Sequence, residues 1–125
     1  MTPADSIRIL TVDDHPVFRD GLAALLGTQP DMSIVAEASN GREAIEQFRR
    51  HRPDIVLMDL QMPEMNGLDA MMAIRSEFPE ARVIILTTFA GDAQGAMTLG
   101  ARAYLLKAQL DKELFGTIRV VRAGK

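Results

Sequence analysis

Acidic, hydroxyl and amino side chains stand directly after short apolar runs in this sequence. In chain order they are Asp13 and Asp14, Asp59, Thr87 and Thr88, and Lys107. A carboxylate without partners is costly to remove from water, so an acid at the end of a buried run needs a physical reason. Three carboxylates within about 4 Å of one another repel by roughly 4 kcal/mol per pair at an effective dielectric near 20. A bound cation would relieve that repulsion.

Such a group of acids fits a hard divalent cation, because Mg²⁺ takes oxygen ligands and retains several waters. Zinc is not expected, because cysteine is absent and the two histidines, His15 and His51, have no ligand spacing between them. With a metal ion held in place, one carboxylate can attack a phosphoryl group and form an aspartyl phosphate.

Asp59 is the expected nucleophile, because it follows the central strand and faces both the acid pair and Lys107. Lys107 is expected to neutralise phosphate oxygens, and Thr87 to form a hydrogen bond with one of them. Each residue taken alone also has an ordinary structural interpretation. The acid pair could cap the following helix, Asp59 could open a turn, Thr87 could favour a strand, and Lys107 could be a solvated surface charge. The chemical interpretation depends on the residues meeting at one place.

The elements that must bring them together alternate in type along the chain. Apolar runs expected to form strands cover residues 7–12, 33–38, 55–58, 82–87 and 104–106. Amphipathic stretches expected to form helices cover residues 16–29, a segment after residue 41, residues 67–78 and 91–100, and a last helix with Asp111 as its N-cap. This order predicts an α/β fold, a doubly wound five-stranded parallel sheet with helices on both faces. Ligands bind beyond the carboxyl ends of the strands in such sheets, where the candidate residues stand.

Two of the helical segments carry more detailed expectations. In residues 67–78, the apolar side chains Leu68, Met71, Met72 and Ile74 are expected mostly to face the core. Residues 91–100 contain glycines and few bulky apolar side chains. Because short helices that contain glycine are marginal without packing, we expect the fourth helix to be short or irregular.

The overall composition restricts the class of protein. The chain has 125 residues, of which 47% are apolar and 25% charged, which suits one globular domain with a core. A net charge of −3 argues against non-specific binding of nucleic acid by this segment. The lack of cysteine excludes disulfides and suits a reducing cytosol, so a cytoplasmic location is expected. The first residues do not resemble a signal peptide, and no apolar run approaches the roughly 20 residues that span a bilayer.

These motifs together resemble the receiver domain of bacterial two-component response regulators. The resemblance rests on Asp13-Asp14, on LMDLQMPEMNG around Asp59, on LTT with Thr87, and on AYLLK ending at Lys107. The stretches VDDHPVFRDGL, GREAIE and YLLK resemble the branch whose receivers precede a helix-turn-helix DNA-binding domain of the LuxR or NarL type. The resemblance implies a flavodoxin-like receiver fold over residues 1–125 with strand order 2-1-3-4-5. Residues 121–125 would begin a linker to a C-terminal DNA-binding domain outside this chain.

The resemblance also implies a role for each candidate residue. Asp59 would accept a phosphoryl group from the phosphohistidine of a sensor histidine kinase, and Lys107 would pair with the phosphate. The ligands of Mg²⁺ would be Asp14 and Asp59 directly, Asp13 through water, and the backbone carbonyl of Gln61. Thr87 and Tyr104 would form a switch pair, and Pro63 and Gly67 would shape the loop after Asp59. Compared with the family, Ala108 replaces a frequent proline, and the interval from Thr87 to Lys107 is short.

The expected output is control of transcription, with DNA contacts only through the part outside this chain. A homodimer is a further option, with a seam formed by Leu114, Ile118 and Val121 together with Val17 or Phe18. Apolar helical stripes of this kind can equally be core. We expect no enzyme activity beyond Mg²⁺-dependent self-phosphorylation and autodephosphorylation.

Other function classes stay open at this point. One alternative is a receiver-like interaction module that works without phosphorylation, although this sequence keeps every acid and the lysine. A phosphohydrolase of the haloacid dehalogenase type is less favoured, because such enzymes typically place a second acid two residues after the nucleophile, where this chain has Gln61. A nucleotide-binding flavodoxin-like domain is a distant third, because neither GxGxxG nor a Walker A loop is present.

Overall fold

A parallel sheet forms the centre of the computed structural model, which describes residues 6–62 and 64–124. Its strands are β1 (Ile7–Val12), β2 (Met32–Ala38), β3 (Ile55–Asp59), β4 (Val83–Thr87) and β5 (Ala103–Leu106). They lie in the order β2-β1-β3-β4-β5, and every neighbouring pair is parallel. The predicted fold class and strand order are therefore confirmed. Pro63, which was expected to shape the loop after Asp59, lies outside the described residues.

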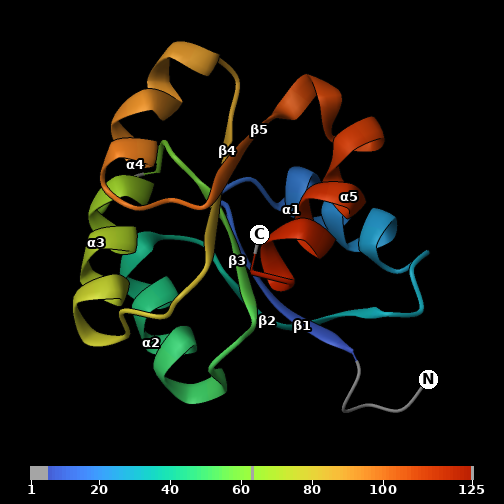
Figure 1. The fold of residues 1–125 in the computed structure, drawn as a ribbon, viewed down its shortest axis with the longest axis horizontal. Helices are drawn as coiled ribbons and strands as arrows, with labels where there is room; N and C mark the ends of the chain where they lie inside the picture. Colours follow the sequence, from blue (N-terminus) through green and yellow to red (C-terminus); the bar gives the residue numbers. More distant parts are fainter. Residues whose placement is uncertain (1–5, 63, 125) are drawn as a thin grey trace.

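Helices cover both faces of the sheet. They are α1 (Pro16–Leu26), α2 (Gly41–His51), α3 (Gly67–Glu77), α4 (Gln94–Thr98) and α5 (Leu110–Arg122), with the 3₁₀ turns η2 (Ala90–Ala93) and η3 (Lys107–Gln109). Figure 1 shows α2, α3 and α4 on one face and α1 and α5 on the other. Among the described residues, no helix has the length and apolar character needed to cross a membrane.

The sheet divides the core into two hydrophobic clusters, one under each layer of helices. Val56 and Met58 of β3 belong to the cluster on the side of α2 and α3, whereas Ile55 and Leu57 belong to the cluster on the side of α1 and α5. All of β3 and β4 is buried, because a parallel sheet covered on both faces exposes neither side of its central strands. The continuous apolar runs in the sequence follow from this arrangement.

Local signals set where several helices begin. Pro16 occupies the first turn of α1, where its missing N–H costs nothing. The Asn40 side chain accepts a hydrogen bond from the Glu43 N–H at the start of α2, and Asn66 accepts one from Asp69 at the start of α3. These caps satisfy backbone donors that a helix start leaves unpaired.

One prediction about the helices is wrong, and another holds for all but one of its residues. Asp111 is not the N-cap of α5, because the turn η3 leads directly into a helix that begins at the buried Leu110 and has Gln109 as its N-cap. Asp111 lies in the first helical turn instead. Met72 does not face the core and is 45% exposed. Met71 and Ile74, three residues apart, share the buried side of α3, and Met72 is rotated away from it.

The fourth helix is short, as predicted. It contains five residues, follows the 3₁₀ turn η2, and is succeeded by Gly100 in a left-handed conformation with φ +114°. The buried side chains of η2 and α4 are the alanines Ala93 and Ala96. This segment therefore has little apolar surface with which to anchor itself.

The proposed dimer seam is wrong as to the residues on α5. Leu114, Ile118 and Val121 are buried against the sheet and belong to the core cluster between α1 and α5. The apolar stripe of α5 is thus used within the chain. Helix α5 includes residues 121 and 122 and ends at Arg122.

Candidate functional site

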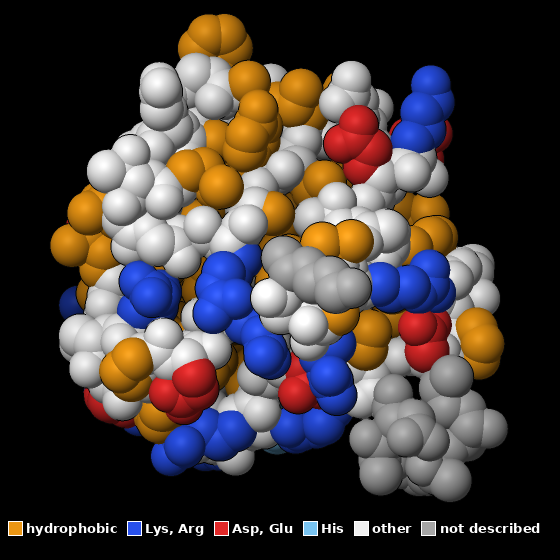
Figure 2. All heavy atoms as spheres, in the orientation of Figure 1, with side chains coloured by type: hydrophobic (Ala, Val, Ile, Leu, Met, Phe, Trp, Pro, Cys, Tyr) orange, Lys and Arg blue, Asp and Glu red, His pale blue; other side chains and the backbone are white. Residues whose placement is uncertain are grey.

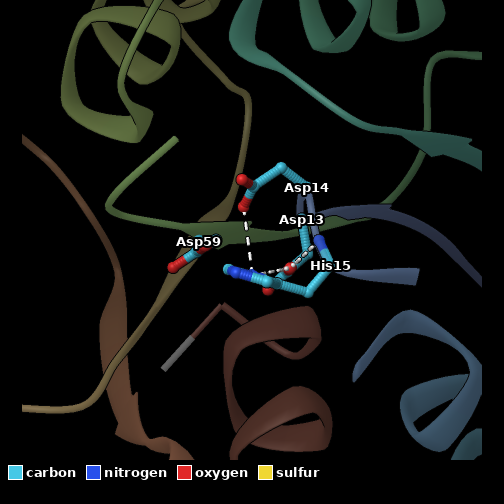
Figure 3. Close-up of side chains that lie close together, drawn as sticks. All are labelled: Asp13, Asp14, His15 and Asp59. Carbon is cyan, nitrogen blue, oxygen red and sulfur yellow. Dashed lines mark hydrogen bonds and ion pairs between the residues drawn. The ribbon is translucent and has the colours of Figure 1, made fainter. Parts of the chain in front are cut away.

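The predicted acids meet at the carboxyl edge of the sheet. Asp13 and Asp14 follow β1, and Asp59 is the last residue of β3, the strand beside β1. Figure 3 shows their side chains close together, and the ligand atoms of these three acids and of His15 all lie within 4.8 Å of one another. Asp13 is 0% and Asp59 4% exposed, so both carboxylates are withdrawn from bulk water.

Lys107 brings a positive charge to the two buried acids. Its Nζ lies 3.2 Å from Asp13 Oδ2 and 3.3 Å from Asp59 Oδ1. The same ammonium stands 4.4 Å from the centre of the Phe18 ring, a cation–π distance that helps to hold the side chain in place. Phe18 was expected as a candidate for a dimer contact, and its position beneath Lys107 could not be read from its apolar character.

The charges and burial around Asp59 do not favour its ionised carboxylate. Burial raises the pKa of the Asp59 carboxyl, the Lys107 charge lowers it in part, and the negative charge of Asp13 raises it again. The net direction is upward, so ionised Asp59 is destabilised by its surroundings. A further cation near this carboxylate would favour the ionised form.

The donor atoms fit a divalent metal ion. Asp14 Oδ1 is buried and accepts no hydrogen bond, although His15 Nδ1 lies 3.1 Å from it. A buried carboxylate oxygen without a hydrogen bond is rare and indicates a missing partner. Carboxylate oxygens that converge from two strands are the ligands that Mg²⁺ prefers, so the residues present are compatible with this ion.

The loop after Asp59 is held tightly against the end of its strand. The Gln61 N–H donates to Asp59 Oδ1 at 3.4 Å, and the Gly67 N–H donates to the Leu60 carbonyl at 2.9 Å. A Cβ on residue 67 would overlap the backbone carbonyl oxygen of Asp59. Glycine is therefore required where α3 begins, and the backbone of Gln61 lies beside the carboxylate.

Of the two residues expected to form a switch, Thr87 is buried at the carboxyl end of β4, the strand beside β3, and Tyr104 lies on β5. The Thr87 hydroxyl donates to the Phe89 carbonyl at 3.2 Å and accepts from the Phe89 N–H at 3.3 Å, so it is engaged in the turn after β4. Its neighbour Thr88 is exposed. Tyr104 on β5 is 41% exposed.

Hydrophobic side chains gather in the upper part of Figure 2, where Figure 1 places α4 and β5.

His15 is the residue whose position the sequence analysis missed. Its Nδ1 lies 3.2 Å from Asp13 Oδ1 and 3.1 Å from Asp14 Oδ1. Zinc was not expected, because cysteine is absent and His15 and His51 have no ligand spacing between them. The signal that could have revealed His15 is its position directly after the acid pair.

Comparison with known proteins agrees with this geometry. The family model for the response regulator receiver domain matches residues 9–119. The response regulator protein VraR of Staphylococcus aureus (strain Mu3 / ATCC 700698) is 35% identical over 122 residues, which cover 96% of this chain and 58% of VraR. The chain thus spans little more than half the length of this curated relative.

Solved structures give the same result. A two-component response regulator of the LuxR family from Aurantimonas sp. SI85-9A1 is 37% identical, with a TM-score of 0.91 over 96% of this chain and 87% of that one. The signal receiver domain of the putative response regulator NarL from Mycobacterium tuberculosis is 30% identical, with a TM-score of 0.90 over 97% of this chain and 99% of that one. The chain belongs to the response regulator receiver domain family, in its LuxR-type branch.

Proposed function

We propose that this domain is the phosphoacceptor of a two-component response regulator, with Asp59 as the phosphorylated residue. The observation that carries the proposal is the position of the Asp59 carboxylate, buried at the end of β3 between the Lys107 ammonium and the acid pair. In the transfer, an Asp59 oxygen forms a bond to phosphorus as the bond from phosphorus to the donor histidine nitrogen breaks. The electron pair of that bond returns to the donor imidazole.

The residues that would hold Mg²⁺ are those that the resemblance names. Asp14 and Asp59 would bind it directly, Asp13 through water, and Gln61 through its backbone carbonyl. The ion, when bound, supplies charge neutralisation for phosphoryl oxygens. Lys107, already 3.3 Å from Asp59 Oδ1, neutralises a further oxygen. The same site supports slow self-phosphorylation from small donors and autodephosphorylation.

Thr87 and Tyr104 would convert the phosphate into a signal. A phosphoryl group adds about −1.5 to −2 charges and three strong acceptor oxygens. The Thr87 hydroxyl would leave Phe89 to donate to one of these oxygens, and the ring of Tyr104 would move inward behind it. In the unphosphorylated state this proposal requires an exposed Tyr104 ring and a Thr87 hydroxyl that hydrogen-bonds to Phe89.

The proposed partners are a sensor histidine kinase and, through a second domain outside this chain, DNA. The length of VraR beyond the matched part supports the second domain. A cavity of about 540 Å³ between α1 and α5 adjoins Lys107 and is lined mostly by apolar side chains, which supports docking of the kinase beside the phosphoacceptor. We place the protein in the cytoplasm, and a homodimer would have to use surfaces other than the buried stripe of α5.

The test is phosphorylation by acetyl phosphate with MgCl₂, followed by intact-protein mass spectrometry. We expect the mass of one added phosphoryl group in the wild type and in the control Asp20→Asn, an exposed acid on α1. Asp59→Asn should show no increase, and chelation of divalent ions should suppress it in the wild type. An increase that persists in Asp59→Asn would refute the assignment of the nucleophile. Steady hydrolysis of a phosphomonoester would instead favour the phosphohydrolase.

A further inference from the structure

The imidazole of His15 lies among the acidic oxygens of the site. Figure 3 shows the ring extending into the space bounded by Asp13, Asp14 and Asp59. Lys107 contacts Asp13 through Oδ2, whereas His15 Nδ1 approaches Asp13 through Oδ1. The nitrogen and the ammonium therefore approach different oxygens of the same carboxylate.

The spacing of the donor atoms is that of ligands around one metal ion. In octahedral coordination, adjacent ligand atoms are separated by √2 times the bond length, or about 3.0 Å for bonds of about 2.1 Å. His15 Nδ1 lies 3.1 Å from Oδ1 of Asp14, a proposed direct ligand, and 3.2 Å from Asp13 Oδ1, its hydrogen-bond partner. The ligand atoms of all four residues lie within 4.8 Å of one another, close to the roughly 4.2 Å that separates opposite ligands with the same bonds. A small contraction would thus bring the nitrogen into a coordination shell with the carboxylates of Asp14 and Asp59.

Among the described residues, the contacts given for the ring are with the acids themselves, and its Nδ1 is within hydrogen-bond distance of Asp13 Oδ1, at 3.2 Å. His15 is the N-cap residue of α1, but its side chain makes no capping hydrogen bond. Its backbone N–H donates to Asp13 Oδ1 at 2.7 Å, which fixes the main chain beside the acids. The side chain is 68% exposed, so it can adjust around an ion without disturbing the core. The buried Asp14 Oδ1, which accepts no hydrogen bond, faces the same space.

We propose that His15 is an additional ligand that suits this site to a borderline first-row transition metal ion, such as Co²⁺ or Ni²⁺. Imidazole nitrogen binds these ions well, whereas Mg²⁺ prefers oxygen and retains its waters. The inference rests on the proposed function, because it concerns the same acid site, and it adds a residue that determines which cation the site selects. His15 should contribute strongly to Ni²⁺ affinity and little to Mg²⁺ affinity.

The test is isothermal titration calorimetry of the metal-free domain with NiCl₂ and with MgCl₂, at one pH, for the wild type, His15→Ala and His51→Ala. His51→Ala is the matched control, because it removes the other histidine, which lies at the end of α2. Substitution of a residue that hydrogen-bonds to a metal ligand lowers metal affinity about 10–100-fold. Loss of a direct ligand should therefore weaken Ni²⁺ binding at least about tenfold. We expect Mg²⁺ affinity to change by less than about twofold, because a water replaces the ring.

A second readout identifies the ligand directly. In the Co²⁺-loaded domain, proton NMR should show a strongly shifted imidazole N–H signal in the wild type and in His51→Ala, and none in His15→Ala. Equal loss of Ni²⁺ and Mg²⁺ affinity in His15→Ala, or unchanged Ni²⁺ affinity, would overturn the role of His15 alone. If the wild type bound neither ion, the cation site of the proposed function would fail as well. Circular dichroism of each variant checks that it is folded.

Discussion

Replacement of Lys107 by methionine should destabilise the metal-free domain because it removes the cation that two buried acids share. Methionine has a similar length and keeps apolar contact with Phe18, so the change mainly removes charge. Lys107 Nζ lies 3.2 Å from Asp13 Oδ2 and 3.3 Å from Asp59 Oδ1, and its side chain is 18% exposed. Without it, both carboxylates remain buried near each other with no ammonium between them.

The magnitude follows from these distances. At an effective dielectric of about 20, each contact corresponds to roughly 5 kcal/mol of attraction before the cost of desolvating the lysine is subtracted. Removal of one partner from a buried ion pair costs about 3–5 kcal/mol, and the partial exposure of Lys107 places the loss near the lower end, at about 3 kcal/mol. For a domain of 125 residues this lowers the midpoint of thermal unfolding by about 11 °C.

The assay is urea unfolding of the wild type, Lys107→Met and the control Lys112→Met, an exposed lysine on α5, with and without MgCl₂. The loss should shrink when Mg²⁺ is present, because a divalent ion then compensates the same carboxylates. It should also be smaller in an Asp59→Asn background, where only Asp13 still needs the ammonium. An equal loss in all of these conditions would refute the idea that Lys107 acts by sharing its charge between the two acids.

Three further changes test other parts of the structure. Gly67→Ala should destabilise the fold by about 2 kcal/mol or more in urea unfolding, because the new Cβ overlaps the Asp59 carbonyl oxygen. The control Gly116→Ala on α5, where a Cβ has open space, should stabilise the fold by up to about 1 kcal/mol. A Gly67→Ala variant as stable as the wild type would contradict the overlap. Asn40→Ala should cost about 1 kcal/mol in the same assay through loss of the cap on Glu43, and no loss would show that solvent replaces the cap. Asp59→Asn should raise the urea midpoint at neutral pH without metal, since burial raises the pKa of Asp59 and ionisation therefore opposes folding. That gain should disappear as the pH falls below about 3.9, the value for an unfolded aspartate, and a gain independent of pH would exclude this cause.

The fold could be predicted because burial on both faces makes the strands continuous apolar runs. Residues 55–58 read as a strand for this reason, and β3 extends one residue further, to Asp59. The meeting of Asp13, Asp14 and Asp59 could be predicted as well, because parallel strands end at a common edge. Their chemical roles stay predictions until phosphorylation and metal binding are measured.

Other features depend on three-dimensional packing that a single sequence does not contain. The stripe of Leu114, Ile118 and Val121 shows that one side of α5 is covered, but not whether the sheet or a second chain covers it. The start of α5 depends on the turn η3, which no single residue in the sequence predicts. The approach of His15 to the acids depends on the path of the chain from β1 into α1 and on its side-chain rotamer.

The shortness of α4 has a consequence for local unfolding of the molecule. Its five residues form little more than one turn, and the buried side chains of η2 and α4 are alanines. Opening this segment exposes little apolar surface, so its amide protons should exchange with deuterium well before those of α2 and α3. A protein that binds this region could select its ordered or its opened form without disturbing the sheet, so the carboxyl edge that carries Asp13 and Asp59 would keep its geometry.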